Sequence, residues 1–74
     1  MSLEERVLDI INAESDGEPI HRRTIERKIG NVIFYWKENP ELAARSIIDE
    51  LIYKGKIIPV SYDYQKSGYI QTME

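Results

Sequence analysis

The sequence contains no cysteine and only one histidine in its 74 residues. It therefore cannot form a disulfide or a thiolate metal site, and one histidine is too few for a histidine-based metal cluster. Its four glycines stand singly, which excludes a glycine-rich phosphate loop. The carboxylates show no pairing in an apolar setting of the kind that general acid–base catalysis uses. The sequence predicts a binding protein rather than an enzyme, and no cofactor.

Long apolar runs are also missing. No segment approaches the roughly 20 apolar residues of a membrane span. The first residues lack the basic region and apolar stretch of a secretory signal. The apolar fraction is 42%, with isoleucine at 12 positions, which suffices for one small core. We expect a single cytoplasmic domain over residues 1–74, with no membrane partner.

The formal net charge of −3 is unevenly distributed along the chain. Residues 1–20 sum to −5, residues 21–37 to +4, and residues 38–56 and 57–74 to −1 each. A basic segment can mark a binding face in a protein whose total charge is negative, although a solvated surface also shows such fluctuations. The net charge therefore does not decide between nucleic acid and protein as partner.

Three helices are predicted from capping signals and from apolar residues at helical spacing. Ser2 and Glu5 have the spacing of a capping box at the start of the first helix. Gly30 is placed to end the second helix. Asn39 is a favourable N-cap for the third, and Pro40 suits its first position. The helices are expected at about residues 3–13, 21–29 and 40–54, with Leu3, Val7, Ile10 and Ile11 buried on the first.

The segments around the second helix are shorter and harder to interpret. Residues 18–20 allow no more than a stub of extended chain. The apolar run from Val32 to Trp36 fits a short strand, a helical turn or a loop over the core. Its tryptophan is expected in the core of so small a domain, although residues 34–37 also suit an aromatic platform for a single strand or a partner.

The last part of the chain predicts a β-hairpin over about residues 57–72. Residues 65–68 have the composition of a turn. Pro59 restricts the first strand to a sheet edge or a bulge, because proline has no N–H to donate. The residues that alternate on one face of this strand are Ile58, Val60, Tyr62 and Tyr64.

Helix, extended stub, helix, helix and hairpin is the element order of a winged helix-turn-helix domain. Residues 45–57, RSIIDELIYKGKI, resemble the end of a winged-helix recognition helix that leads into the wing. Residues 17–30 resemble the stub and second helix, and residues 67–70 resemble the second wing strand. The resemblance implies an α+β winged-helix fold of three helices with a C-terminal hairpin wing. Residues 31–39 depart from it, because this connection is longer and more aromatic than the usual turn.

The resemblance also implies a function, namely that of a small transcriptional regulator or accessory factor that binds duplex DNA. The third helix would enter the major groove, where its N-terminal part reaches base edges, and the wing would touch the backbone. Basic residues on the second helix would contact phosphates, which positions a protein without reading sequence. The expected DNA-binding residues are Arg22, Arg23, Arg27, Lys37, Arg45, Ser46 and Lys66.

A protein-interaction module or inhibitor is the alternative. Leu42, Ser46, Asp49 and Tyr53 lie opposite the apolar arc of the third helix, and none is positive. A DNA-reading helix usually presents more arginine, lysine, asparagine or glutamine. Leu42 and Tyr53 would then meet a protein partner, and Arg45 would pair with Asp49 four residues on.

The sequence also bears on the oligomeric state and on the surface feature that would separate DNA from protein as partner. Regulators of palindromic sites are usually dimers, so a homodimer is compatible with the DNA-binding interpretation. The surface charge separates the two interpretations: a continuous positive face favours DNA, and a face broken by Asp49 and Glu41 favours protein. The residues that such a positive face would join are Arg22, Arg27, Arg45 and Lys66.

Overall fold

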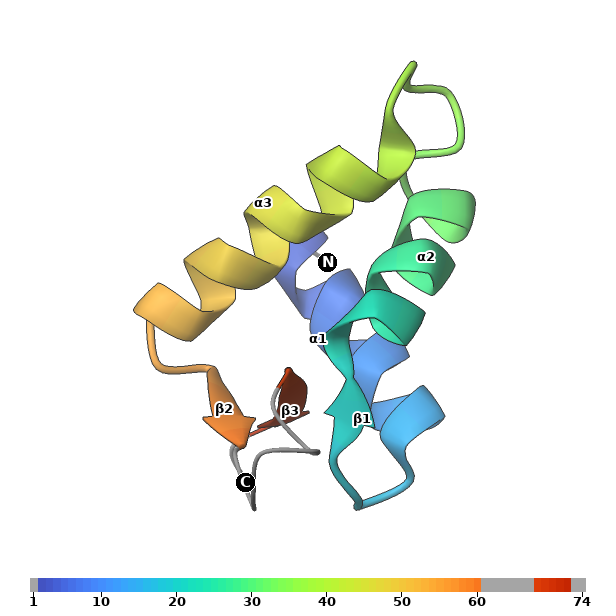
Figure 1. The fold of residues 1–74 in the computed structure, drawn as a ribbon. Helices are drawn as coiled ribbons and strands as arrows, with labels where there is room; N and C mark the ends of the chain where they lie inside the picture. The colour runs from blue at the N-terminus through green and yellow to red at the C-terminus, as the bar shows by residue number, and fades with distance from the viewer. Residues whose placement is uncertain (1, 61–67, 73–74) are drawn as a thin grey trace.

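A computed structural model describes residues 2–60 and 68–72 of the chain. They form an α+β fold of three helices and a three-stranded antiparallel sheet, ordered β1-β3-β2 (Figure 1). The sequence predicted a two-stranded hairpin, but the stub before the second helix adds a third strand. The elements are α1 (Leu3–Ser15), β1 (Ile20–His21), α2 (Arg22–Val32), α3 (Pro40–Tyr53), β2 (Ile57–Val60) and β3 (Tyr69–Thr72).

The sheet lies where α2 begins and α3 ends (Figure 1). β3 is the central strand, and it pairs Ile70 with Ile20 of β1 and with Pro59 of β2. β2 is therefore an edge strand, the position expected for a strand that contains a proline. Ile57 is buried in the core and Ile58 is 45% exposed, so Ile58 lies on the outer face; Tyr62 and Tyr64 of the predicted alternating set lie outside the described residues. The turn predicted for residues 65–68 lies outside the described residues except for Gly68.

The core joins all three helices to the sheet. Val7 and Ile11 of α1 are completely buried, as predicted. Leu3, the first residue of α1, is 43% exposed, so its predicted burial is wrong and the apolar stripe begins one turn later. The buried apolar residues are Val7, Ile11, Ile25, Ile29, Ile33, Phe34, Ala44, Ile47, Ile48, Leu51, Ile57 and Ile70.

The helix starts follow the sequence signals more closely than the helix ends. The Ser2 hydroxyl accepts the Glu5 backbone N–H at 3.2 Å, and Pro40 is the first residue of α3. Asn39 occupies the N-cap position of α3, but its side chain makes no capping hydrogen bond. Gly30 does not end α2, which continues to Val32.

Gly30 has a different role, which its place in the helix explains. It is buried, and a Cβ at this position would lie 3.1 Å from both the carbonyl carbon and the oxygen of Pro40. Real Cβ atoms rarely come so near to backbone. A side chain at this position would therefore press against the backbone of α3, so Gly30 serves close helix packing rather than a turn.

The connection from α2 to α3 divides its apolar run between core and surface. The Ile33 and Phe34 N–H groups donate to Ile29 and Gly30, which prolongs the helical turn and directs both side chains inward. Tyr35 and Trp36 are exposed, Trp36 by 68%, so the expectation of a core tryptophan is wrong. Lys37 lies over the Trp36 ring, 4.8 Å from its centroid.

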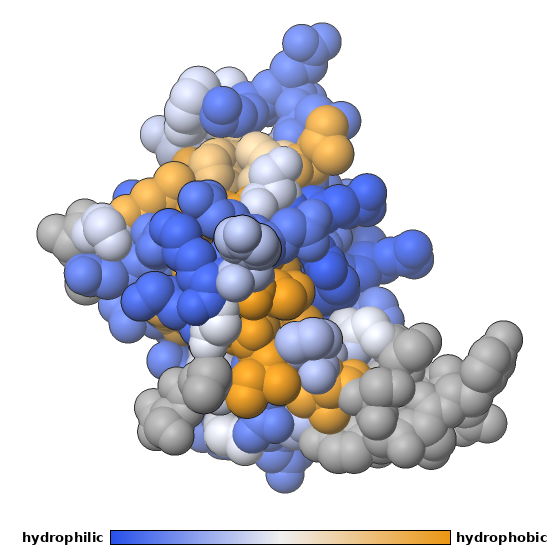
Figure 2. All heavy atoms as spheres, turned by 90° about the vertical axis from the view of Figure 1, so that its left-hand side faces the viewer, coloured by the Kyte–Doolittle hydropathy of each residue, from blue (hydrophilic) through white to orange (hydrophobic). Residues whose placement is uncertain are grey.

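The surface combines charged areas with exposed apolar side chains. On the face drawn in Figure 2, hydrophobic atoms reach the surface as a strip between two hydrophilic areas. Among residues 2–60 and 68–72, no helix has both the length and the apolar character that a membrane crossing needs.

Candidate functional site between α2, α3 and β3

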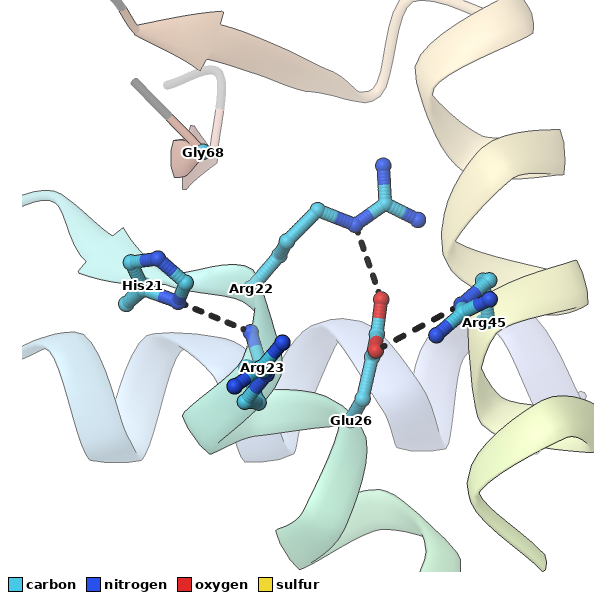
Figure 3. A pocket seen from close by; sticks show the side chains of 6 residues that line it. All are labelled: His21, Arg22, Arg23, Glu26, Arg45 and Gly68. Carbon is cyan, nitrogen blue, oxygen red and sulfur yellow. Dashed lines mark hydrogen bonds and ion pairs between the residues drawn. The ribbon is translucent and has the colours of Figure 1, made fainter. Parts of the chain in front are cut away.

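An open pocket of about 290 Å³ lies where α2 begins, beside α3 and the start of β3 (Figure 3). Its lining is strongly basic, with three arginines against one glutamate. Three of the residues that the sequence pointed to for DNA binding meet here, from two different helices. The lining residues are His21, Arg22, Arg23, Glu26, Arg45 and Gly68.

The start of α2 is fixed by its neighbours in sequence and by β3. His21 is the N-cap residue, and its Nδ1 accepts the Arg23 backbone N–H at 3.1 Å. The Arg22 backbone N–H donates to the Gly68 carbonyl at 2.9 Å, which ties the helix to the beginning of β3. Both of these backbone donors are therefore occupied, and the positive character of the pocket comes from side chains.

Gly68 lets the chain pass close to the histidine. Its φ is +94°, and a Cβ there would lie 3.1 Å from Nε2 of His21. The other side of the imidazole meets Tyr69 edge-to-face, with ring centroids 5.3 Å apart. The histidine ring is thus held between a capping bond, a glycine and an aromatic ring, which defines one wall of the pocket.

Glu26 lies between two of the arginines, as Figure 3 shows. Its side chain accepts the Arg22 Nε–H at 2.8 Å and lies 3.8 Å from the Arg45 Nε. Glu26 is only 6% exposed and is the one buried charged residue in the described part of the chain. A carboxylate is stable at such a site only when paired, and the two guanidinium groups provide that pairing.

Arg22 joins α2 to α3 through a second contact. Its Nη2 donates to Oδ1 of Asp49 at 2.6 Å. Burial lowers the pKa of Arg22, but the hydrogen bonds to Asp49 and Glu26 outweigh burial, and its pKa lies above the ordinary value. Arg22 is therefore charged at every accessible pH, and it cross-links the two helices.

The other residues predicted to bind DNA lie outside the pocket. Arg27 pairs with Glu41 of α3 at 3.6 Å, with both side chains exposed. Ser46 is exposed on α3, and Lys37 lies in the connection above Trp36. Lys66 lies outside the described residues.

Acidic residues interrupt the basic face at the two positions that the sequence singled out. Asp49 pairs with Arg22, and Glu41 pairs with Arg27. Arg45 faces Glu26 rather than the Asp49 considered as its intrahelical partner. On the same helix, Leu42 is 52% exposed and Tyr53, the last residue of α3, is 88% exposed.

Sequence reasoning missed three of the lining residues as parts of a site. His21, Glu26 and Gly68 were not among the expected binding residues. The spacing of Glu26 four residues after Arg22, within an otherwise basic segment, is the one sequence signal that could have indicated Glu26.

Protein-family models, curated proteins and solved structures show no match to this chain. Within residues 2–60 and 68–72, no group of three or more histidine, aspartate or glutamate side chains is arranged to hold a metal ion. The pocket offers hydrogen-bond donation from guanidinium groups, and the exposed face of α3 offers contact through mixed polar and apolar side chains.

Proposed function

We propose that this chain is a winged-helix protein that binds duplex DNA, with the exposed face of α3 in the major groove. The observation that carries the proposal is the meeting of Arg22, Arg23 and Arg45 in one pocket beside that face. The element order, with a short strand before α2 and two strands after α3, supports the winged-helix assignment. In this arrangement α3 reads bases, and the arginines contact the backbone.

The acidic partners on this face lower the expected affinity without preventing phosphate contact. Exposed ion pairs such as Arg27–Glu41 are worth about 0–1 kcal/mol. A DNA phosphate can therefore displace Glu41 from Arg27 at small cost. Arg23 is exposed and makes no ion pair within the described residues, so it needs no such exchange. Binding of moderate affinity and strong salt dependence follows.

The test is fluorescence anisotropy of a labelled duplex, titrated at several salt concentrations. About four to six phosphate contacts predict a slope near −4 to −5 for log K against log salt. The double variant Arg23→Ala with Arg45→Ala is expected to reduce the magnitude of this slope by about 2, because two contacts are lost. Arg6→Ala is the control, since Arg6 lies on α1 and does not line the pocket. Absence of saturable binding at low salt would contradict the proposal. So would an Arg6→Ala variant that lowers DNA affinity as much, per charge removed, as the double variant does.

A protein partner is the second candidate, favoured by the exposure of Leu42 and Tyr53 on α3. The broken positive face also fits this function better than a continuous basic face would. A nuclease-treated pull-down compares two variants. Leu42→Glu with Tyr53→Glu is expected to lose a stoichiometric partner that Arg23→Ala with Arg45→Ala retains. Recovery of nucleic acid alone would count against this candidate.

A further inference from the structure

We propose that the pocket between α2, α3 and β3 holds a single phosphate group, and that Glu26 is the residue that positions its arginines. The inference rests on the proposed function in one respect, because the DNA backbone is the source of phosphate expected there. Free inorganic phosphate has the same chemistry and serves as the probe.

The charge of the pocket matches one phosphate. The three arginines and one glutamate that line it carry a formal charge of +2 together. Asp49, which contacts Arg22 at the rim, reduces this sum to +1. A phosphodiester carries one negative charge and a phosphomonoester about 1.5 to 2 at neutral pH. The excess of positive charge is thus of the size that a single phosphate neutralises.

The donors of Arg22 and Arg45 are arranged by Glu26. The carboxylate accepts a hydrogen bond from the Arg22 Nε–H at 2.8 Å and forms a looser ion pair with Arg45, whose Nε lies 3.8 Å away, beyond hydrogen-bond distance. A guanidinium has five N–H donors, so a partner at Nε leaves the two terminal nitrogens for another acceptor. Those of Arg45 have no partner within the described residues, whereas Arg22 uses one of its own on Asp49. Arginine binds phosphate through such terminal groups, often with two parallel hydrogen bonds.

The burial of Glu26 makes this arrangement more than a chance surface pairing. Its side chain is 8% exposed, so packing limits its movement, whereas Arg45 is 61% exposed. An otherwise mobile arginine is thus held near a fixed carboxylate. Binding then orders fewer rotamers, which is the usual advantage of a preorganised site.

The start of α2 contributes little to the pocket directly. The N–H groups of Arg22 and Arg23 already donate to Gly68 and to His21. Affinity for phosphate is therefore expected to depend on the arginine side chains. Arg45→Gln should weaken phosphate binding by about tenfold, the effect of one strong charged hydrogen bond. Arg27→Gln is the matched control, because Arg27 is paired with Glu41 outside the pocket.

The measurement is an amide and arginine Nε–H NMR titration with inorganic phosphate, at constant ionic strength. Saturable shifts confined to the residues that line the pocket, with the arginine Nε–H shifts among them, are the expected result. The pocket proposal is overturned if no shift saturates, or if Arg27→Gln weakens binding as much as Arg45→Gln. Arg45 is exposed, so its variant is expected to fold and the test does not depend on a damaged core.

The positioning role of Glu26 has its own readout. Glu26→Gln makes the pocket more positive by one charge, so a purely electrostatic role predicts tighter phosphate binding. A positioning role predicts weaker binding and a loss of the separate Arg45 Nε–H shift, with partial rescue by Glu26→Asp. Tighter binding in Glu26→Gln would overturn the positioning role. The amide spectrum of each variant is compared first to confirm that the fold is retained.

A duplex titration separates this proposal from the proposed function. Competition between phosphate and duplex, with both weakened by Arg45→Gln, supports both. Saturable phosphate binding without duplex binding keeps the pocket, assigns free phosphate as its ligand and rejects the DNA function. Duplex binding that Arg45→Gln leaves unchanged, without saturable phosphate shifts, keeps the DNA function and rejects the pocket.

Discussion

The two ends of the α2–α3 pair are held together in contrasting ways. At the charged end, Arg22 and Glu26 of α2 meet Arg45 and Asp49 of α3 through ion pairs. At the aromatic end, Gly30 lies against the backbone of Pro40, and the connection buries Phe34. A ligand can replace the partners of an arginine, but it cannot replace close backbone packing. We therefore expect the charged end to be responsible for binding and the aromatic end for stability.

The aromatic end tests this division most strongly, because it places two large aromatic residues in opposite environments. Phe34 is 8% exposed and Trp36 is 68% exposed, although only Tyr35 separates them. Phe34→Ala leaves a cavity and is expected to lower the free energy of unfolding by about 3–5 kcal/mol. Trp36→Ala is the matched control and should change it by about 0.5 kcal/mol or less. Urea unfolding followed by circular dichroism measures both, and similar losses would refute the assignment of Phe34 to the core and Trp36 to the surface.

The same contrast separates what the sequence could predict from what it could not. The helix starts rest on local chemistry, and Ser2 and Pro40 take the positions that their capping preferences indicated. Gly30 was misassigned because a glycine that ends a helix and one that permits close approach look alike in a sequence. Trp36 was misassigned because burial depends on which residues of a turn face the core. The role of Gly30 and the exposure of Trp36 both depend on how α3 packs on α2, which is a property of the folded chain.

The charged end shows an intermediate degree of predictability. The winged-helix resemblance, together with the charge of +4 on residues 21–37, indicated the three pocket arginines as candidate contacts. Their partners were not predictable, since Arg22 and Asp49 are 27 residues apart and meet only through the helix crossing. β1 was underestimated for a related reason. It has two residues, and its pairing partners, Tyr69 and Ile70, lie near the other end of the chain.

Glu26 and Glu41 allow the effect of burial on an ion pair to be tested, because each pairs with an arginine of α2 but only Glu26 is buried. Glu26→Gln leaves Arg22 without its buried partner and is expected to destabilise the fold by about 1–2 kcal/mol, below the usual cost of breaking a buried pair because Arg22 remains partly exposed. Glu41→Gln, in the exposed pair with Arg27, should cost at most about 0.5 kcal/mol. Urea midpoints at low and moderate salt distinguish them. Equal costs would show that burial gives Glu26 no special role.

Lys54 provides the smallest expected effect, from a charge cluster that belongs to neither end. Its Nζ contacts Glu4 of α1 and Glu50 of α3. The hydrogen bond to Glu4 raises the pKa of Lys54 above its ordinary value of 10.5, against a weaker opposing effect of burial. A pKa that is higher in the folded state stabilises the fold below the unfolded value, and this contribution disappears as the pH rises through the folded value.

The advantage of the native chain over Lys54→Met should therefore be constant up to about pH 9 and vanish above the folded pKa. Lys56→Met is the control, because Lys56 is exposed and makes no ion pair within residues 2–60 and 68–72. Its difference from the native chain gives the reference for losing a lysine charge outside an ion pair. Both differences are measured as shifts of the urea midpoint over this pH range. The native chain and both variants have the same tyrosines, so the tyrosine contribution cancels in each difference. An advantage that persists or grows at high pH would mean that the aliphatic stem of Lys54 stabilises the fold rather than its charge. In that case the arginine stems at the charged end would also be expected to stabilise the fold by packing. A phosphate cannot displace that packing.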